Sequence, residues 1–153
     1  MTSFRKTALP ILDWVFAIGV AGLFATAAIP KILAPAEFAS IIWRYDLLPD
    51  VAVNLTVLFL PWLELVCAIG LVCIPRIRLE IYWLLGILLA AFTIATALNL
   101  LRGISAPCGC FGSASSDPPA TWWHVLRNLG FLAGIGCGAW VRALLKSKFP
   151  LSK

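Results

Sequence analysis

Four long apolar segments constrain this chain more than any other feature. They cover residues 9–29, 51–74, 79–101 and 123–145, and each reaches the roughly 20 residues that a helix needs to cross a bilayer. Helices suit these segments because every backbone N–H and C=O must be satisfied inside hydrocarbon. Charged residues make up only 12% of the chain, whereas a soluble domain carries about a quarter. The sequence therefore predicts an all-α integral membrane protein, folded as a single four-helix bundle over residues 1–153.

The first apolar segment has some features of a secretory signal peptide. Arg5 and Lys6 precede it, and Ala25-Thr26-Ala27 resembles a cleavage site. The segment is long for a signal core, however, and Asp13 interrupts it near its start. We therefore expect it to stay in the protein as a membrane helix.

The basic residues are distributed unevenly between the two sides that four alternating helices would define. Eight of the twelve Lys and Arg fall on the side of the termini, and because positive charge is retained in the cytoplasm we expect both termini to be cytoplasmic in a bacterial inner membrane. The +5 net charge is then explained by topology and contact with membrane lipid, without nucleic acid. The residues on this side are Arg5, Lys6, Arg76, Arg78, Arg142, Lys146, Lys148 and Lys153.

The segment 30–50 is expected to contain a short amphipathic helix on the outer membrane surface, between the first two spanning helices. Pro35 suits a first helical turn, and the helix should end before Pro49. Either it anchors the chain at the interface, with Trp43 and Tyr45 as belt aromatics, or it caps a buried site; the anchor is the favoured interpretation. Its apolar residues, at helical spacing, are Phe38, Ile41, Ile42 and Tyr45.

Glu64 lies about midway along the second apolar segment, three residues after Pro61. A carboxylate at this depth costs free energy, so Glu64 is a candidate functional residue and should have a positively charged partner. Lys31 and Arg127 are the candidate partners, since both enter from the outer side. The pair could fix helix packing or handle protons, and the sequence does not separate these alternatives.

Small and polar residues form stripes on the later helices. Gly130, Gly134 and Gly138 recur at a spacing of four, which allows close helix approach. Thr93, Thr96 and Asn99 share a face of the third spanning helix, and Cys67 shares the face of Glu64. These stripes could meet in a polar seam, but ordinary packing is the favoured interpretation for the glycines and threonines.

The loop 102–122 places Cys108 and Cys110 one residue apart, around Gly109. On the outer side disulfides persist, but a disulfide needs Cα atoms about 4.4–6.8 Å apart. The chain must therefore bend at Gly109, which permits unusual backbone angles. The resulting ring is small and strained, hence easily reduced. This predicts a redox-active pair in an outward redox loop.

Other roles for the cysteines stay open. The pair could form an inert local disulfide, bind a metal with His124 and Asp117, or remain as free thiols, although the spacing matches no common zinc pattern, so no metal site is predicted. Cys73 and Cys137 are expected to be buried and to behave as small hydrophobes.

Side chains near the pair could assist thiol exchange. Arg102, and also Arg127, would favour a thiolate by their charge. His124 could move a proton near neutral pH, although a satisfied interfacial histidine is the favoured alternative. Phe111 and the tryptophans of the loop would hold it at the headgroup level.

In order along the chain, several short elements resemble the MauE-like branch of the DoxX superfamily, four-helix bacterial membrane proteins named for methylamine utilisation. Cys108-Gly109-Cys110-Phe111-Gly112 is the most specific of them. The others are Pro30-Lys31, Phe38, Tyr45-Asp46-Leu47-Leu48-Pro49, Leu60-Pro61, Glu64-Leu65, Gly70-Leu71, Arg102-Gly103 and Arg127-Asn128.

The resemblance implies a role in maturing a periplasmic, disulfide-rich amine dehydrogenase subunit, alongside a thioredoxin-like partner. By fold-level analogy it also implies a likeness to quinone-linked membrane enzymes that form disulfides. We therefore expect a thiol–disulfide redox protein acting on a thioredoxin-like protein or a disulfide-containing client, with a membrane quinone as the candidate acceptor. Two alternatives are a non-enzymatic assembly subunit of a membrane complex and a small-molecule carrier built around Glu64.

Overall fold

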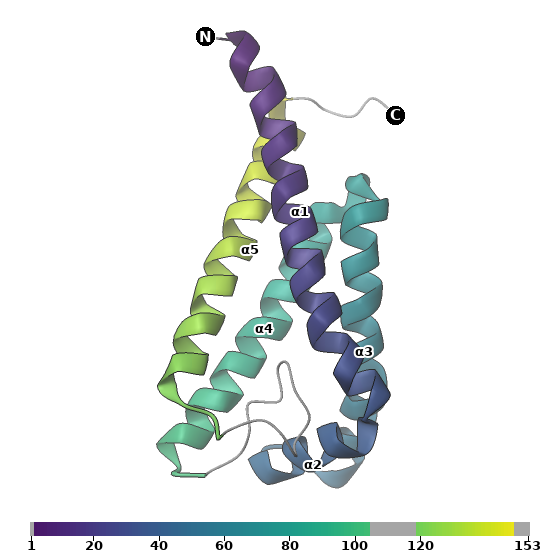
Figure 1. Ribbon diagram of the computed structural model, residues 1–153, viewed down its shortest axis with the longest axis vertical. Helices are drawn as coiled ribbons and strands as arrows, with labels where there is room; N and C mark the ends of the chain where they lie inside the picture. The colour runs from purple at the N-terminus through teal and green to yellow at the C-terminus, as the bar shows by residue number, and fades with distance from the viewer. Residues whose placement is uncertain (1, 105–118, 149–153) are drawn as a thin grey trace.

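The computed structural model describes the backbone of residues 2–104 and 119–148, and the side chains of residues 8–104 and 119–147. Within these ranges the chain forms five α-helices and one 3-10 turn. They are α1 (Thr2–Leu33), α2 (Pro35–Tyr45), α3 (Asp50–Cys73), η1 (Pro75–Ile77), α4 (Arg78–Leu101) and α5 (Trp122–Lys148) (Figure 1).

Four of the helices are long and apolar enough to cross a membrane. The spanning segments are Ala8–Leu33, Asp50–Cys73, Pro75–Leu101 and Trp122–Ser147. Their outward side chains are large and apolar; Ile18, Phe59, Ile94 and Leu126 are each more than half exposed. Such a surface is stable only against hydrocarbon, so the prediction of a multi-pass, four-helix membrane protein is confirmed.

The spanning helices alternate in direction, and the bundle has two distinct ends (Figure 1). The start of α1, the end of α5 and η1 lie at one end, called here the termini end. The opposite end, called here the loop end, holds α2, the last turn of α4 and the first turn of α5. Helix α1 packs against α3 and α5, and α4 packs against α5.

Helix α1 is longer than the apolar segment that predicted it. We expected it to end at residue 29, but it continues through Pro30 to Leu33. Pro30 lacks an N–H, yet its carbonyl still accepts a hydrogen bond of 2.9 Å from the N–H of Ala34. The helix therefore loses one donor at Pro30 and resumes its pattern in the next turn, which places Lys31 within the helix.

Helix α2 packs against the spanning helices, chiefly α3. Phe38 and Ile42 contact Val53 of α3, and Tyr45 is only 6% exposed. Tyr45 was expected to be a belt aromatic, and this expectation is wrong because its side chain is buried in a cluster with Ile41 and Ala95. Trp43 is 53% exposed, as a belt residue would be.

The end of α2 follows from local backbone geometry. Asp46 adopts a left-handed conformation with φ of 47°, and its N–H donates to the carbonyl of Trp43. Asp tolerates this region better than most residues. The chain then turns into Pro49, after which α3 begins.

The apolar core occupies the part of the bundle between its centre and the termini end. It joins four helices through side chains that are almost fully buried. Its members are Val20, Ala21, Phe24, Cys67, Ala68, Leu71, Ile81, Tyr82, Leu85 and Ile135.

Gly138 is the glycine of the α5 stripe that permits close packing. A Cβ added there would lie 2.9 Å from Cζ of Tyr82, whereas one added at Gly130 or Gly134 would meet nothing within 4 Å. The predicted packing stripe is therefore correct at Gly138 and wrong at the other two positions, because Gly130 and Gly134 line an open cavity between α1 and α5.

Replacing Gly138 by alanine is expected to destabilise the bundle by about 1–3 kcal/mol, since the added methyl group would overpack the Tyr82 ring. Gly130→Ala is the matched control and should be neutral or stabilising, because alanine is favoured over glycine in a helix by up to about 1 kcal/mol. Unfolding of both variants in the same detergent measures the difference. Equal shifts for the two variants would contradict the packing described here.

Candidate functional site

A buried ion pair joins α1 to α3 within the membrane-spanning region. Lys31 Nζ lies 2.8 Å from Oε2 and 3.0 Å from Oε1 of Glu64, so both carboxylate oxygens accept from one ammonium group. The two side chains are 4% and 3% exposed. Lys31 reaches Glu64 because α1 continues through Pro30, and Glu64 lies one turn beyond Pro61 on α3.

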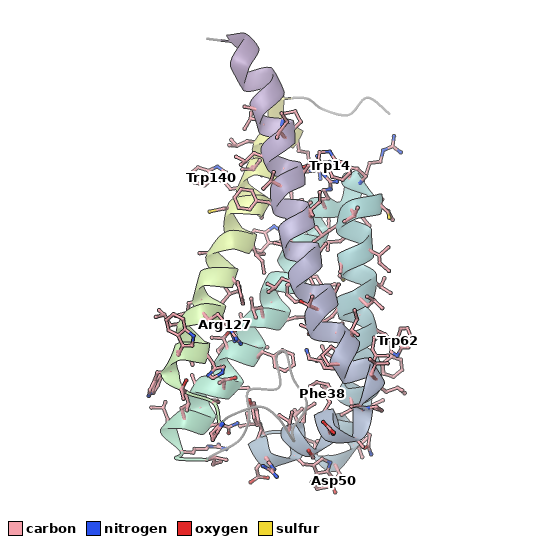
Figure 2. All side chains as sticks on the ribbon, in the orientation of Figure 1. Trp14, Phe38, Asp50, Trp62, Arg127 and Trp140 are labelled. Atoms are coloured by element: carbon pink, nitrogen blue, oxygen red, sulfur yellow. The ribbon has the colours of Figure 1, made fainter. Side chains whose placement is uncertain are left out.

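Two aromatic rings complete the surroundings of the ammonium group. The Lys31 nitrogen lies 5.3 Å from the ring centroid of Phe38 on α2 and 4.9 Å from that of Phe92 on α4. Aromatic faces attract cations, most strongly where water is excluded. Lys31 therefore holds α1, α2, α3 and α4 together at one point, and Figure 2 shows Phe38 near the loop end.

Of the two predicted partners of Glu64, Lys31 is the one that pairs with it. Arg127 lies on α5 near the loop end (Figure 2) and is half-buried. A small cavity of about 30 Å³ adjoins the pair, and Asn128 and Phe131 form part of its wall. A single water needs roughly 10–15 Å³ of such space, so this cavity is far too small for an organic substrate.

The predicted polar seam is buried, but its hydroxyl groups bond within their own helix. Thr93 donates to the carbonyl of Leu89 and Thr96 to that of Phe92. Asn99 is 2% exposed, and its side-chain amide has no hydrogen-bond partner among the described residues. The threonines therefore serve packing, the interpretation favoured from the sequence, whereas Asn99 is a costly polar group facing the interior.

The flanks of the predicted redox loop lie at the loop end. Arg102 is exposed and follows α4 directly, and Gly103 turns the chain with φ of 71°. His124 lies in the first turn of α5, where its Nδ1 accepts a 3.0 Å hydrogen bond from the N–H of Thr121. This contact gives His124 a structural capping role, the alternative to proton transfer that the sequence left open.

The predicted exchanging residues lie outside the described residues. These are Cys108 and Cys110 with their neighbours Gly109, Phe111 and Gly112. Their pairing and role stay predictions. The described chain brings Arg102, His124 and Asn128 to the end of the bundle from which this segment leaves and to which it returns.

The helical cysteines differ from expectation. Cys73 and Cys137 are exposed on the outside of the bundle, so the prediction that both are buried is wrong. Each lies on a helix face that points to lipid. A small apolar side chain suits that position as well as it suits the protein interior. Cys67 is buried within the core, one turn beyond Glu64.

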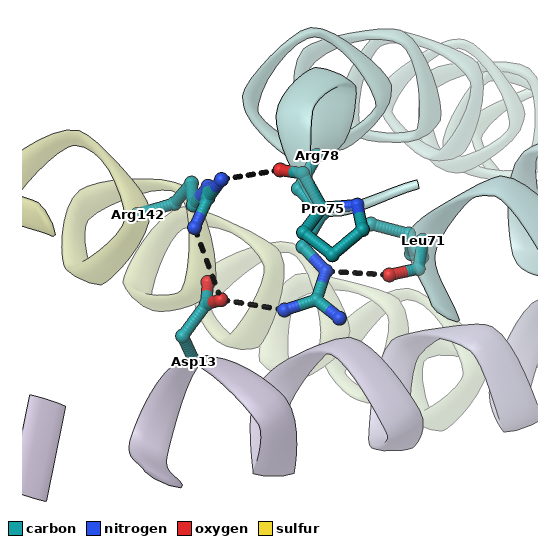
Figure 3. Close-up of polar contacts among 5 residues, drawn as sticks. All are labelled: Asp13, Leu71, Pro75, Arg78 and Arg142. Carbon is teal, nitrogen blue, oxygen red and sulfur yellow. Dashed lines mark hydrogen bonds and ion pairs between the residues drawn. The ribbon is translucent and has the colours of Figure 1, made fainter. Parts of the chain in front are cut away.

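Sequence reasoning missed a second charged cluster, at the termini end. Asp13 on α1 accepts a 2.6 Å hydrogen bond from Arg78 and lies 3.5 Å from Arg142 on α5 (Figure 3). Asp13 and Arg78 are 2% and 1% exposed. The sequence interpretation assigns both arginines to topology and contact with membrane lipid, whereas in the structure they face into the bundle.

The two arginines also bind the chain between α3 and α4. Arg78 donates to the carbonyl of Leu71, and Arg142 donates to that of Pro75 (Figure 3). The guanidinium of Arg78 lies 3.8 Å from the ring centroid of Trp14. The apolar first segment could have revealed this cluster, because Asp13 is the one charged residue between residues 9 and 29, and such a residue needs a partner.

Four spanning helices, a packed amphipathic helix at one end and a buried charge cluster near each end define a small multi-pass membrane protein without a soluble domain in the described residues. Its sequence matches the family described as methylamine utilisation protein MauE over residues 9–141, and the chain belongs to this family. The wider link to the DoxX superfamily stays a prediction.

Curated relatives support the assignment. The chain is 36% identical to the methylamine utilization protein MauE of Paracoccus denitrificans over 121 residues, covering 78% of this chain and 64% of the relative. It is 35% identical to that of Paracoccus versutus over 142 residues, covering 92% and 74%. For Methylorubrum extorquens the values are 40% over 130 residues, 84% and 68%. The chain thus spans only part of these relatives, and no solved structure matches it.

Removing one partner of the Lys31–Glu64 pair is expected to cost about 3–5 kcal/mol, because the other charge stays buried without compensation. Replacing both residues by methionine should restore most of that stability, since apolar side chains of similar volume often substitute well for a buried pair. A double-mutant cycle by unfolding in detergent measures the coupling. Additive effects of Lys31→Met and Glu64→Met would show that the contact is not formed.

At the termini end, Asp13→Asn should destabilise strongly, because two inward-facing arginines lose their carboxylate. Arg142→Met should have a smaller effect than Arg78→Met, since Arg142 is the more exposed and the more distant of the two. Unfolding measurements compare these variants with Glu80→Gln, which breaks only an exposed pair. An equal loss in Glu80→Gln and Asp13→Asn would argue against the cluster.

Proposed function

We propose that this chain is a membrane component of methylamine utilisation that carries out thiol–disulfide exchange for the maturation of a periplasmic amine dehydrogenase subunit. Family membership and the methylamine utilization role named for the curated relatives support the first part. The second part is supported by the position of the Cys-Gly-Cys segment between the end of α4 and the start of α5. That position is the observation that carries the proposal.

The bundle holds the two flanks of this segment at the end opposite the termini. Arg102 and Gly103 leave α4 there, and the exposed Trp122 and Trp123 begin α5. The termini end carries the larger share of basic residues, and positive charge is retained in the cytoplasm. In a bacterial inner membrane the loop end, and with it the cysteine pair, would then face the periplasm.

The proposed exchange passes through a mixed disulfide between the client and this chain. A thiolate of the client attacks one sulfur of the Cys108–Cys110 disulfide, which forms a mixed disulfide and releases the other cysteine as a thiolate. A second client thiolate then displaces the bound cysteine, leaving an oxidised client and a reduced Cys108–Cys110 pair. Two electrons and two protons pass on to an acceptor, for which a membrane quinone, reduced to the hydroquinone, has the required chemistry.

The bundle itself serves this proposal as a rigid support. Lys31 and Glu64 satisfy each other near the loop end, and the Asp13 cluster lies near the termini end. The apolar core lies between them. This layer separates the two polar clusters, and the cavity at Glu64 is small, so the arrangement argues against a carrier built around Glu64.

An assembly subunit is the second candidate function. The observation in its favour is that the charged residues inside the described bundle form contacts that join helices rather than an open polar site. In that case the cysteine pair would lock the loop to a partner without turnover.

Trapping experiments separate these two functions. Cys110→Ser leaves Cys108 as a lone thiol, which can still attack a disulfide of an oxidised client or partner but lacks the neighbouring thiolate that would release the mixed disulfide. A reducible adduct with a periplasmic protein is therefore expected on non-reducing gels. Cys73→Ser is the control, since Cys73 lies exposed within the membrane span and should trap nothing. The adduct should disappear in Cys108→Ser/Cys110→Ser.

The accessibility of the wild-type pair provides the second measurement. A membrane-impermeant alkylating reagent added to the periplasmic side should modify both cysteines after mild reduction. Labelling only from the cytoplasmic side would overturn the proposed exchange. A bond that reduces only after unfolding, together with no adduct, would favour the assembly role.

A further inference from the structure

An elongated groove runs along the outside of the bundle between α4 and α5. Its volume is about 560 Å³. Small residues, including Gly86 on α4 and Gly136 and Ala139 on α5, form its floor. Trp83 and Trp140 border it and are 65% and 69% exposed, and Figure 2 shows Trp140 projecting outward from α5.

The groove has the length and surroundings of a site for a hydrocarbon chain. It extends from Leu79 to Ala90 on α4, which corresponds to about 16 Å at 1.5 Å per residue. Both of its helices are membrane-spanning over this range. Its walls are apolar along this length, so a saturated or unsaturated alkyl chain would bury carbon against carbon.

Charged residues lie at the groove's termini end. Lys146 and Glu80 form a pair of 3.1 Å across α4 and α5, with side chains 56% and 57% exposed. Arg142 lies one turn before Lys146 on α5. Together with Asp13 and Arg78, these residues comprise three cations and two carboxylates, a net charge of +1.

This charge favours a negatively charged headgroup. The Glu80–Lys146 pair is exposed, and such pairs contribute little stability of their own, so a phosphate can replace the carboxylate beside Lys146. Basic residues near a membrane surface attract anionic lipid. The groove and the basic end share one face, because Glu80 lies three residues before Trp83 and Lys146 three residues after Ala143, and both Trp83 and Ala143 line the groove.

We infer that the α4–α5 groove binds an anionic phospholipid, with an acyl chain along Gly86 and Gly136 and the phosphate at Lys146. A second copy of the chain is the competing occupant. A two-fold arrangement of parallel copies would bring the two basic ends to the same membrane depth, and like charges oppose that contact. The inference does not depend on the proposed thiol chemistry.

The test uses the full chain, reconstituted in nanodiscs with equal amounts of phosphatidylglycerol and phosphatidylcholine, then released and examined by native mass spectrometry. The wild type should keep phosphatidylglycerol in preference to phosphatidylcholine. Lys146→Gln should lower that preference about fivefold, and Glu80→Gln should raise it, since removing one basic residue costs about that factor near a membrane surface.

A groove-filling variant tests the acyl chain separately. Gly136→Leu should abolish lipid retention without unfolding the protein, because a Cβ at Gly136 meets nothing within 4 Å. Gly130→Leu is the matched control on the same helix, where a Cβ also meets nothing within 4 Å, and should retain phosphatidylglycerol. Thermal unfolding of each variant confirms that it is folded.

Three results would overturn the inference. One is equal retention of the two lipids by the wild type. Another is unchanged phosphatidylglycerol retention in folded Gly136→Leu. The third is a dimer that Gly136→Leu dissociates, which would assign the groove to a second copy.

Discussion

Burial of charge in hydrocarbon is the constraint on which this structure depends. A lysine or carboxylate within the membrane has no water to solvate it, so each must find a partner on another helix. Lys31–Glu64 and Asp13–Arg78 meet this requirement at distances of 2.8 and 2.6 Å. Both contacts link segments far apart in the sequence, and they fix which helices become neighbours in a way that apolar packing alone would not, since lipid tails are as apolar as the helices.

Each end of the bundle holds a buried charge cluster, but the two clusters differ in their net charge and in their access to the surface. Near the loop end, the charge of Lys31 is enclosed by Glu64 and two phenyl rings, under the cap that α2 forms. At the termini end, the cluster around Asp13 has an excess of positive charge and continues to the surface through Arg142. The ion pair at the loop end is thus closed off from the surface, whereas the cluster at the termini end is basic and reaches it.

Much of this could be predicted from the sequence, and the failures have physical reasons. Four spans follow from the long apolar segments. The cost of an isolated carboxylate indicates that Glu64 needs a cationic partner, but it leaves Lys31 and Arg127 as equal candidates, and only the structure assigns Lys31. The end of α1 was placed too early because proline was taken to end a helix, whereas membrane-spanning helices tolerate proline and α1 continues through Pro30. Predicting the Asp13 cluster would have required the knowledge that the start of α4 and the end of α5 lie against α1. Arg78 and Arg142 were instead assigned to topology, and that assignment does not indicate that their side chains point inward. Burial of Tyr45 depends on how α2 docks, which its own periodicity does not specify.

Helix α1 carries both of the buried anchors, Asp13 and Lys31, eighteen residues apart, a separation of about 27 Å. Displacing this helix by a single turn, about 5.4 Å, would break the contacts at both of its anchors together. Sliding or rocking of α1 against its neighbours, as helices move in transporters, would therefore have to break two buried ion pairs at once. Any rearrangement of the bundle that keeps both contacts must therefore leave the position of α1 along its own axis unchanged.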